Sequence, residues 1–98
     1  MQYNFDWDPN KERANRQKHK VGFRHAASVF RDPNQLTIYD DEHSDDEERW
    51  LTIGLDAGGI VRVVSHTFEQ LDAETVAIRI ISARKAVGDE IAQYTIGT

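Results

Sequence analysis

The sequence has no cysteine, which excludes disulfide bonds and thiolate metal sites and predicts a reducing compartment. No apolar run approaches the roughly 20 residues that cross a bilayer, so no transmembrane helix is expected. Residues 1–6 lack the basic and apolar segments of a signal peptide. Together these absences predict a cytoplasmic protein that does not associate with membranes.

Basic residues are absent from residues 32–48, which carry eight acids and no lysine or arginine. Residues 1–31 show the opposite balance, with seven basic residues against three acidic ones. The net charge of −5 disfavours direct binding to DNA, because nucleic-acid binders are usually basic overall. A chain whose charges are segregated in this way still presents one basic face to an anionic partner.

The 98 residues are long enough for one domain with a modest core. Asp8 followed by Pro9 is typical of a helix start, which predicts a helix over 9–19, and apolar spacing predicts a second helix over 23–30. A short aromatic strand precedes them, and alternating patterns predict strands over 35–39, 47–55, 60–68 and 76–81 before a final helix over 84–94. This order predicts one α+β domain over 1–98, with an antiparallel sheet of about four strands, two N-terminal helices and one C-terminal helix.

The turn at residues 56–59 determines the expected register of the strands. If this turn closes a symmetric hairpin, Leu55 faces Ile60 and Arg49 lies opposite His66. If Phe68 likewise pairs with Thr75 across the next turn, His66 faces Ala77 and Arg79 is its diagonal neighbour. The cationic side chains that then share one face are Arg49, Arg62, His66 and Arg79. The main core is expected on the other face.

Two arginines and a histidine on one face suit the chemistry of a phosphodiester. Arg49 and Arg79 offer planar forks to phosphate oxygens and can stabilise a charged transition state, and His66 or Glu48 can carry a proton. In RNA the neighbouring 2′-hydroxyl is a built-in nucleophile, so neither a metal nor a cofactor is expected. Two plainer interpretations stay open: Arg79 in an ordinary ion pair, and His66 as a structural histidine of the sheet.

Three further features carry weaker signals. Lys18 and His19 suit contacts to a phosphate backbone, although a solvated helix end explains them equally well. Trp7 suits either stacking on a base or burial beside Phe5. His43 lies in an acidic stretch whose spacing matches no calcium loop, so no metal site is predicted there.

Four stretches together carry a pattern that spans nearly the whole chain. They are Phe5-Asp6-Trp7-Asp8-Pro9, then Lys18-His19 with Val21 and Phe23, then His43-Ser44 with Glu47 or Glu48 and Arg49, and last Arg79-Ile80-Ile81-Ser82-Ala83-Arg84-Lys85-Ala86. In this order and spacing the chain resembles the BrnT family of toxins. Family members usually continue the final helix with several arginines, whereas this chain has Asp89 and Glu90 there.

The resemblance implies a RelE-like α+β fold and the toxin of a type II toxin–antitoxin pair. It implies an endoribonuclease that stops translation. It also implies a hetero-oligomer with a BrnA-like ribbon-helix-helix antitoxin, which neutralises the toxin and alone contacts operator DNA. The site residues that the resemblance implies are Trp7, Lys18, His19, Glu48, Arg49, Arg79 and Arg84. Trp7, Lys18, His19 and Arg84 are the residues expected to bind RNA, whereas His66 is predicted from the strand register more than from the resemblance.

A different class of function fits the same residues. A cationic face with apolar neighbours such as Leu51 and Ile53 also suits a binding module without turnover, which docks an acidic antitoxin segment and co-represses its operon. Growth arrest on expression, relieved by co-expression of the neighbouring gene, distinguishes a toxin from an inert binder.

Overall fold

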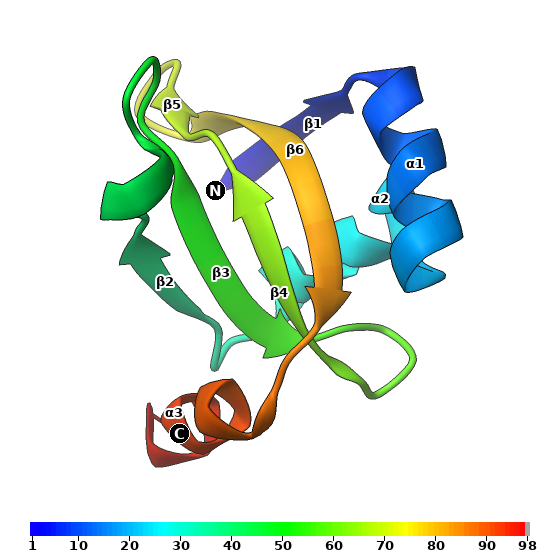
Figure 1. Ribbon diagram of the computed structural model, residues 1–98. Coiled ribbons are helices and arrows are strands. Elements are labelled where there is room, and N and C mark those ends of the chain that lie inside the picture. Colours follow the sequence, from blue (N-terminus) through cyan, green and yellow to red (C-terminus); the bar gives the residue numbers. More distant parts are fainter. Residues whose placement is uncertain (98) are drawn as a thin grey trace.

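The computed structural model describes residues 1–97 as a curved sheet with helices on one side and a C-terminal helix at one end (Figure 1). The strands are β1 (Gln2–Trp7), β2 (Leu36–Tyr39), β3 (Trp50–Leu55), β4 (Val61–His66), β5 (Glu69–Gln70) and β6 (Thr75–Lys85). The helices are α1 (Pro9–His19), α2 (Phe23–Ala26) and α3 (Gly88–Gly97), with the 3-10 segments η1 (Ala27–Arg31) and η2 (Asp41–His43). The predicted α+β class is confirmed. No helix within residues 1–97 has the length and apolar character to cross a bilayer.

The sheet has six strands within residues 1–97, in the order β1-β6-β4-β3-β2, with β5 also paired to β6. β1 runs parallel to β6, and the other pairs are antiparallel. The prediction of about four antiparallel strands is therefore wrong in the number of strands and in the direction of β1. Alternation identifies β1 as a strand, but its partner lies about 70 residues away, so the pattern says nothing about direction.

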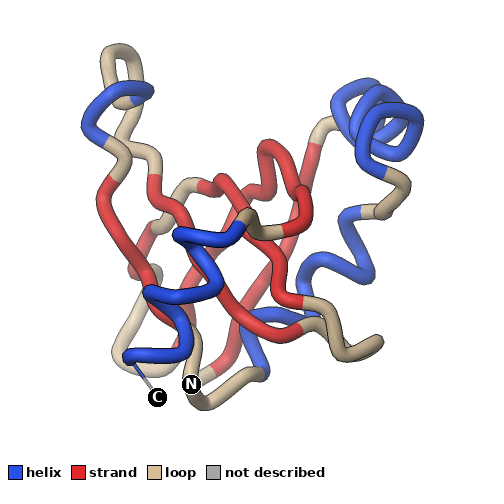
Figure 2. The backbone as a smooth tube through the Cα atoms, turned by 60° about the horizontal axis from the view of Figure 1, so that its bottom comes forward, coloured by secondary structure: helices blue, strands red, loops and turns tan. Residues whose placement is uncertain are grey.

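The sheet has two unlike faces, which we call the inner face and the open face. The inner face packs against α1, α2 and η1 (Figure 1). It holds the core, to which Val76, Ile78 and Ile80 of β6 belong. Ala77 and Arg79 alternate with them and project on the open face. Figure 2 shows α3 running across one end of the sheet, apart from α1, and it packs against β3.

Helix α1 starts where the sequence predicts. The Asp8 carboxylate caps it by accepting the N–H of Asn10 at 2.8 Å, and Pro9 begins its first turn. The buried residue of α1 is Asn15, whose side-chain amide donates to the carbonyl of Ala83 at 2.9 Å and accepts the N–H of Ala83 at 3.1 Å. These two hydrogen bonds attach α1 to β6.

The last strand is longer than predicted and the last helix starts later. The helix was expected from residue 84 but begins at Gly88. Asn15 holds the backbone of Ala83 extended as part of β6. Glu90 accepts the N–H of Val87 at 2.9 Å and so caps the helix at its later start. Hydrogen bonds from a distant helix thus outweigh the local helix signal.

The β3–β4 hairpin is not the symmetric one predicted, because its loop includes Ile60. The buried carboxylate of Asp56 accepts the N–H groups of Gly58 at 2.8 Å and Ile60 at 3.0 Å. Leu55 therefore pairs with Val61 rather than with Ile60. A shift of one residue moves the side chains of β4 to the opposite face relative to the prediction.

The pairing of β4 with β6 also departs from the prediction. His66 pairs with Ile80, three positions later in β6 than expected, and the register shifts between Ser65 and His66. Such a bulge inserts an extra residue into one strand. Beyond it Val64 pairs with Ala83, and both belong to the core. His66 consequently lies on the inner face.

Candidate active site

The four cationic residues expected on one face are divided between two faces. Arg49 and Arg79 project on the open face, whereas Arg62 and His66 are buried on the inner side. The prediction of one cationic face is wrong because it depended on a symmetric hairpin and on an unbulged β6.

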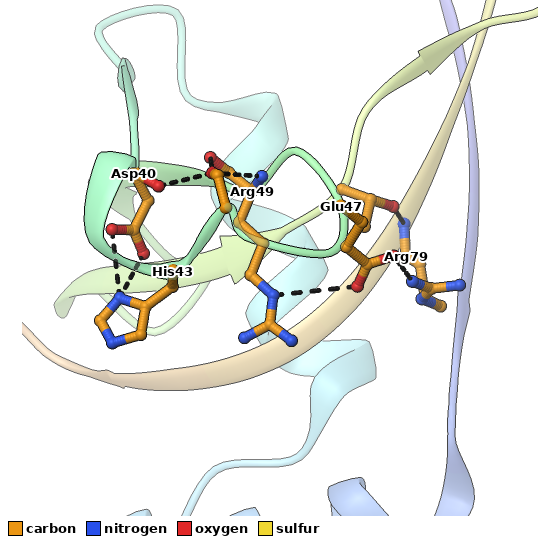
Figure 3. Close-up of polar contacts among 7 residues, drawn as sticks. Asp40, His43, Glu47, Arg49 and Arg79 are labelled. Atoms are coloured by element: carbon orange, nitrogen blue, oxygen red, sulfur yellow. Dashed lines mark hydrogen bonds and ion pairs between the residues drawn. The ribbon is translucent and has the colours of Figure 1, made fainter.

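Arg49 and Arg79 converge on Glu47 (Figure 3). One carboxylate oxygen of Glu47 accepts a hydrogen bond from a terminal nitrogen of Arg79, and the other lies 3.8 Å from Nε of Arg49. The side chains are 38% exposed for Glu47, 30% for Arg49 and 47% for Arg79, so solvent reaches the whole cluster. Two guanidinium groups that converge in this way can form a binding site for an anion such as a phosphate.

Backbone hydrogen bonds hold both arginines in position. The N–H of Arg49 donates to Oγ of Ser44 at 3.0 Å, and the carbonyl of Arg49 accepts the N–H of Asp40 at 2.9 Å. The N–H of Arg79 donates to Oγ1 of Thr67 at 3.2 Å, and the carbonyl of Arg79 accepts the N–H of Thr67 at 3.0 Å. Nε of Arg49 is buried without a hydrogen-bond partner within residues 1–97, because the carboxylate of Glu47, at 3.8 Å, is too far for a hydrogen bond.

His66 is a residue of the core. It is 1% exposed, and Phe30 packs edge-on against its ring at 4.9 Å. Nδ1 donates to the carbonyl of Thr67 at 2.8 Å, so Nε2 accepts from the hydroxyl of Thr52 at 2.7 Å. Burial lowers the pKa of His66 and favours the neutral ring. This geometry suits a structural histidine and keeps His66 away from Arg79.

The lowered pKa of His66 predicts a pH-dependent stability. An unfolded histidine has a pKa of about 6.5, whereas the folded chain binds this proton less readily, so acid favours the unfolded state. As the pH falls from 7 to 5, we expect the free energy of unfolding to decrease, by at most about 1.4 kcal/mol per pH unit from this group. Urea denaturation of the parent and of His66→Gln measures it. An equal slope in both proteins would contradict the assignment.

Glu48 is adjacent to Arg49 in the sequence, and Arg84 lies on the open face of the sheet, but the two side chains differ in their contacts. Glu48 is exposed and makes no ion pair within residues 1–97. Two nitrogens of Arg84 donate to the two carboxylate oxygens of Glu90, each at 2.7 Å. The hydrogen bond with Glu90 raises the pKa of Arg84, and the same contact lowers the pKa of Glu90. Arg84 is thus neutralised by α3.

The remaining predicted contact residues lie on the other side of the sheet. Trp7 is half-buried on the inner face, where its ring meets Phe23 edge-on at 6.1 Å. Lys18 is exposed and His19 half-buried at the end of α1 (Figure 1). The structure therefore separates Trp7, Lys18 and His19 from the Arg49–Glu47–Arg79 cluster.

The sequence pattern offered Glu47 or Glu48 as the acidic residue, and the prediction chose Glu48, whereas the structure places Glu47 between the two arginines. In the predicted strand over 47–55, Glu47 and Arg49 point the same way because they are two residues apart. The structure brings the two side chains together although β3 begins only at Trp50. The parity of Glu47 and Arg49 was the available signal. The cluster that results can bind a phosphate through its guanidinium groups and accept a proton through its carboxylate. Within residues 1–97, no three His, Cys, Asp or Glu side chains are grouped to hold a metal ion.

Comparison with known proteins places the chain in a family. The family described as "Ribonuclease toxin, BrnT, of type II toxin-antitoxin system" matches residues 7–90. No match was found among curated proteins. The crystal structure of the Brucella abortus ribonuclease toxin BrnT is similar in fold, with a TM-score of 0.60 and 24% identity over 90% of this chain and 100% of that one. Because the family match spans most of the sequence, the chain belongs to the BrnT family of ribonuclease toxins of type II toxin–antitoxin systems.

Proposed function

We propose that the chain is a single-domain, cytoplasmic endoribonuclease toxin that cleaves RNA without a metal ion and so stops translation. The observation that carries this proposal is Glu47 held between Arg49 and Arg79 on the open face of the sheet. Family membership gives the ribonuclease class. The three side chains supply the groups that cleavage of a phosphodiester needs.

In the proposed mechanism, Arg79 and Arg49 bind the non-bridging oxygens of the scissile phosphate and stabilise the charge of the pentacovalent transition state. Glu47 accepts the proton of the 2′-hydroxyl, whose oxygen attacks phosphorus. The new P–O2′ bond replaces the P–O5′ bond, and the 5′-oxygen leaves with a proton from solvent. Glu48 is the second candidate for the proton carrier. His66 has no part in these steps, because both of its ring nitrogens are engaged in the core.

Four residues are proposed to contact RNA outside the reacting phosphate. Arg84 lies on the open face, where a phosphate would compete with Glu90 for its guanidinium group. Lys18 and His19 would steady the backbone from the end of α1. Trp7 would stack a base on the inner side of β1.

Replacing Glu47 by glutamine should slow RNA cleavage about 100-fold. Glutamine keeps the size of the side chain and can still accept a hydrogen bond from Arg79, but it cannot take up the proton. The measurement is the initial rate of cleavage of purified RNA with a chelator present. Glu42→Gln, an exposed change in the same loop, is the control and should keep the parent rate. Full activity of E47Q together with loss of activity in Glu48→Gln would transfer the role to Glu48.

We also propose that a BrnA-like ribbon-helix-helix antitoxin neutralises the chain in a hetero-oligomer and supplies all contacts to operator DNA. The type II class of the family supports an antitoxin partner. The net charge of −5 supports indirect rather than direct binding to DNA. The curved sheet with helices on one face also supports a RelE-like fold.

A specific observation favours the second candidate, a binding module without turnover. Arg49, Arg79 and Arg84, the arginines of the open face, are all paired with glutamates, which reduces their attraction for RNA. Expression in bacteria separates the two functions. The toxin should arrest growth and E47Q should not, whereas an inert module would arrest growth in neither form.

A further inference from the structure

A groove on the inner side of the molecule is lined by residues of β1, α1 and the α2–η1 segment. We call it the β1 groove. Its volume is about 1200 Å³, above the roughly 300–1000 Å³ of a typical small-molecule pocket. The residues that determine its chemistry are three aromatic and three basic ones: Tyr3, Phe5, Trp7, Arg16, Arg24 and Arg31. An open groove of this size suits a polymer better than a small ligand.

The three arginines of the β1 groove make no direct ion pair within residues 1–97. Arg16, Arg24 and Arg31 are exposed, and no hydrogen bond or ion pair engages their side chains within residues 1–97. Glu12 also lines the groove, where its carboxylate accepts the N–H of Phe23 at 3.0 Å and keeps its negative charge, so the three arginines still outnumber the acid. On the open face, by contrast, the arginines are paired with glutamates. The groove is therefore the place where unpaired guanidinium groups gather.

The aromatic residues form a regular row along one wall. Tyr3, Phe5 and Trp7 alternate along β1 and are all half-buried, so they lie about 6.6 Å apart on the same face. The rings of Tyr3 and Phe5 are stacked, with centroids 5.8 Å apart and an interplanar angle of 24°. Phe30 and Phe23 support the row from the core side. Aromatic side chains beside arginines are the usual platform for the bases of a single strand.

We propose that the β1 groove binds a single-stranded segment of the RNA substrate next to the cleavage site, with its phosphates on the arginines and its bases against the aromatic row. This inference rests on the proposed function. β1 is the edge strand, and its Asp6 is paired with Arg79 of β6. Only one strand, about 4.8 Å wide, therefore separates Arg79 from the edge of the sheet. An RNA strand that leaves Arg79 enters the groove by passing over β1.

The chemistry of the groove favours RNA over an acidic peptide. Its three unpaired basic residues are all arginines, although the chain also has lysines on α1. Arginine combines a fork for phosphate oxygens with a plane that stacks on bases, which lysine lacks. A peptide that added to the sheet would instead bond to the free backbone edge of β1 and would not need the aromatic row on its face.

Binding to a labelled 2′-O-methyl oligonucleotide of about ten nucleotides tests the groove without cleavage. In the full chain, Arg24→Glu and Arg31→Glu should each weaken binding about tenfold and lower its dependence on salt concentration. Arg13→Glu is the matched control, because Arg13 is exposed on α1 outside the groove and the change in charge is the same. If Arg24→Glu and Arg31→Glu bind the oligonucleotide as tightly as Arg13→Glu does, the proposal is overturned.

Tryptophan fluorescence gives a second readout. The chain has two tryptophans, so Trp50→Phe leaves Trp7 as the single reporter. The oligonucleotide should quench Trp7 in a saturable way, and Arg24→Glu should shift this quenching to higher concentrations. Binding without any change in the fluorescence of Trp7 would overturn the placement of bases on the aromatic row.

Cleavage assays distinguish failure of this inference from failure of the proposed function. A dinucleotide has only the scissile phosphate, which leaves no phosphate for the arginines of the groove, so Arg24→Glu should cleave it at the parent rate but cleave long RNA more slowly. If Arg24→Glu cleaves long RNA at the parent rate, the groove proposal fails and the proposed function stands. If the parent cleaves neither substrate, the proposed function fails, and the groove is judged by the binding assay. Loss of antitoxin binding in Arg24→Glu with unchanged RNA binding would make the groove an antitoxin surface and overturn the inference.

Discussion

Replacing Arg79 by alanine is expected to slow RNA cleavage by about 10²- to 10³-fold, the usual cost of removing a donor that stabilises a developing oxyanion. Arg79 is 47% exposed and pairs with a glutamate that is 38% exposed. Exposed ion pairs of this kind contribute only about 0–1 kcal/mol to stability, so the variant should remain folded. The loss of rate therefore reports on chemistry. It is measured as kcat/KM on purified RNA with a chelator present.

Two further variants make the result for Arg79 specific. Arg13→Ala removes an exposed arginine from α1 and should keep the parent rate. Arg79→Lys keeps the charge but loses the planar fork, so its rate should lie between those of the parent and Arg79→Ala. Equal rates for the parent and Arg79→Ala would remove Arg79 from the mechanism.

Replacing Asp56 by alanine is expected to lower the free energy of unfolding by about 3–5 kcal/mol, because it leaves a buried cation without its partner. The side chain of Asp56 is fully buried and that of Arg62 is 7% exposed, and Nε of Arg62 lies 2.8 Å from an oxygen of Asp56. Asp56 also accepts the N–H groups of Gly58 and Ile60 and pairs with His25 at 3.1 Å. A small domain has about 5–15 kcal/mol in total, so this loss brings the chain close to unfolding.

Urea denaturation at pH 7 measures the effect, with Asp41→Ala in the exposed loop as the control. Adding Arg62→Met to Asp56→Ala should restore part of the stability, because it removes the unpaired charge. Burial alone would raise the pKa of Asp56, but hydrogen bonds from Arg62 and from the loop amides hold it below its ordinary value. The contribution of Asp56 is therefore present above about pH 4 and lost as the pH falls through the folded pKa. A loss below about 1 kcal/mol at pH 7 would contradict the importance assigned to this pair.

Local signals predicted the elements of the fold well. Asp8 and Pro9 start α1 as expected, because a cap and a first-turn proline act within a few residues. The stripe that contains Phe23, Ala26 and Phe30 is buried as helical spacing predicts, but the helix predicted over 23–30 is α-helical only to Ala26 and continues as the 3-10 segment η1. Sequence patterns therefore predicted those features that depend only on residues close together in the sequence.

The register depended on contacts that no local pattern contains. The carboxylate of Asp56 accepts the N–H of Ile60, which makes Ile60 part of the hairpin loop, and it also accepts a hydrogen bond from the buried guanidinium of Arg62. Asn15 binds the backbone of Ala83, 68 residues away, and keeps it in β6. The first contact shifts the pairing of β4 by one residue, which changes the face of its side chains, and the second extends β6 beyond its predicted end.

The error in the predicted strand register also made part of the predicted site wrong. Arg49 and Arg79 were predicted together and are together, although through Glu47 rather than through His66. The assumption of a symmetric hairpin placed His66 on the same face as Arg49 and Arg79, whereas it lies on the inner face. The row of aromatics in β1 was visible in the sequence, but its groove is formed by α1 and η1 and needed the tertiary structure.

The most direct test of the proposed mechanism is the chemistry of the cleaved ends. The purified chain is incubated, with a chelator present, with DNA strands that each contain one ribonucleotide, one strand for each base. The 2′-hydroxyl mechanism predicts a cut only on the 3′ side of the ribonucleotide, leaving a 2′,3′-cyclic phosphate and a 5′-hydroxyl. Cleavage of the all-DNA strand, 5′-phosphate ends, or activity only after adding a divalent metal would contradict it.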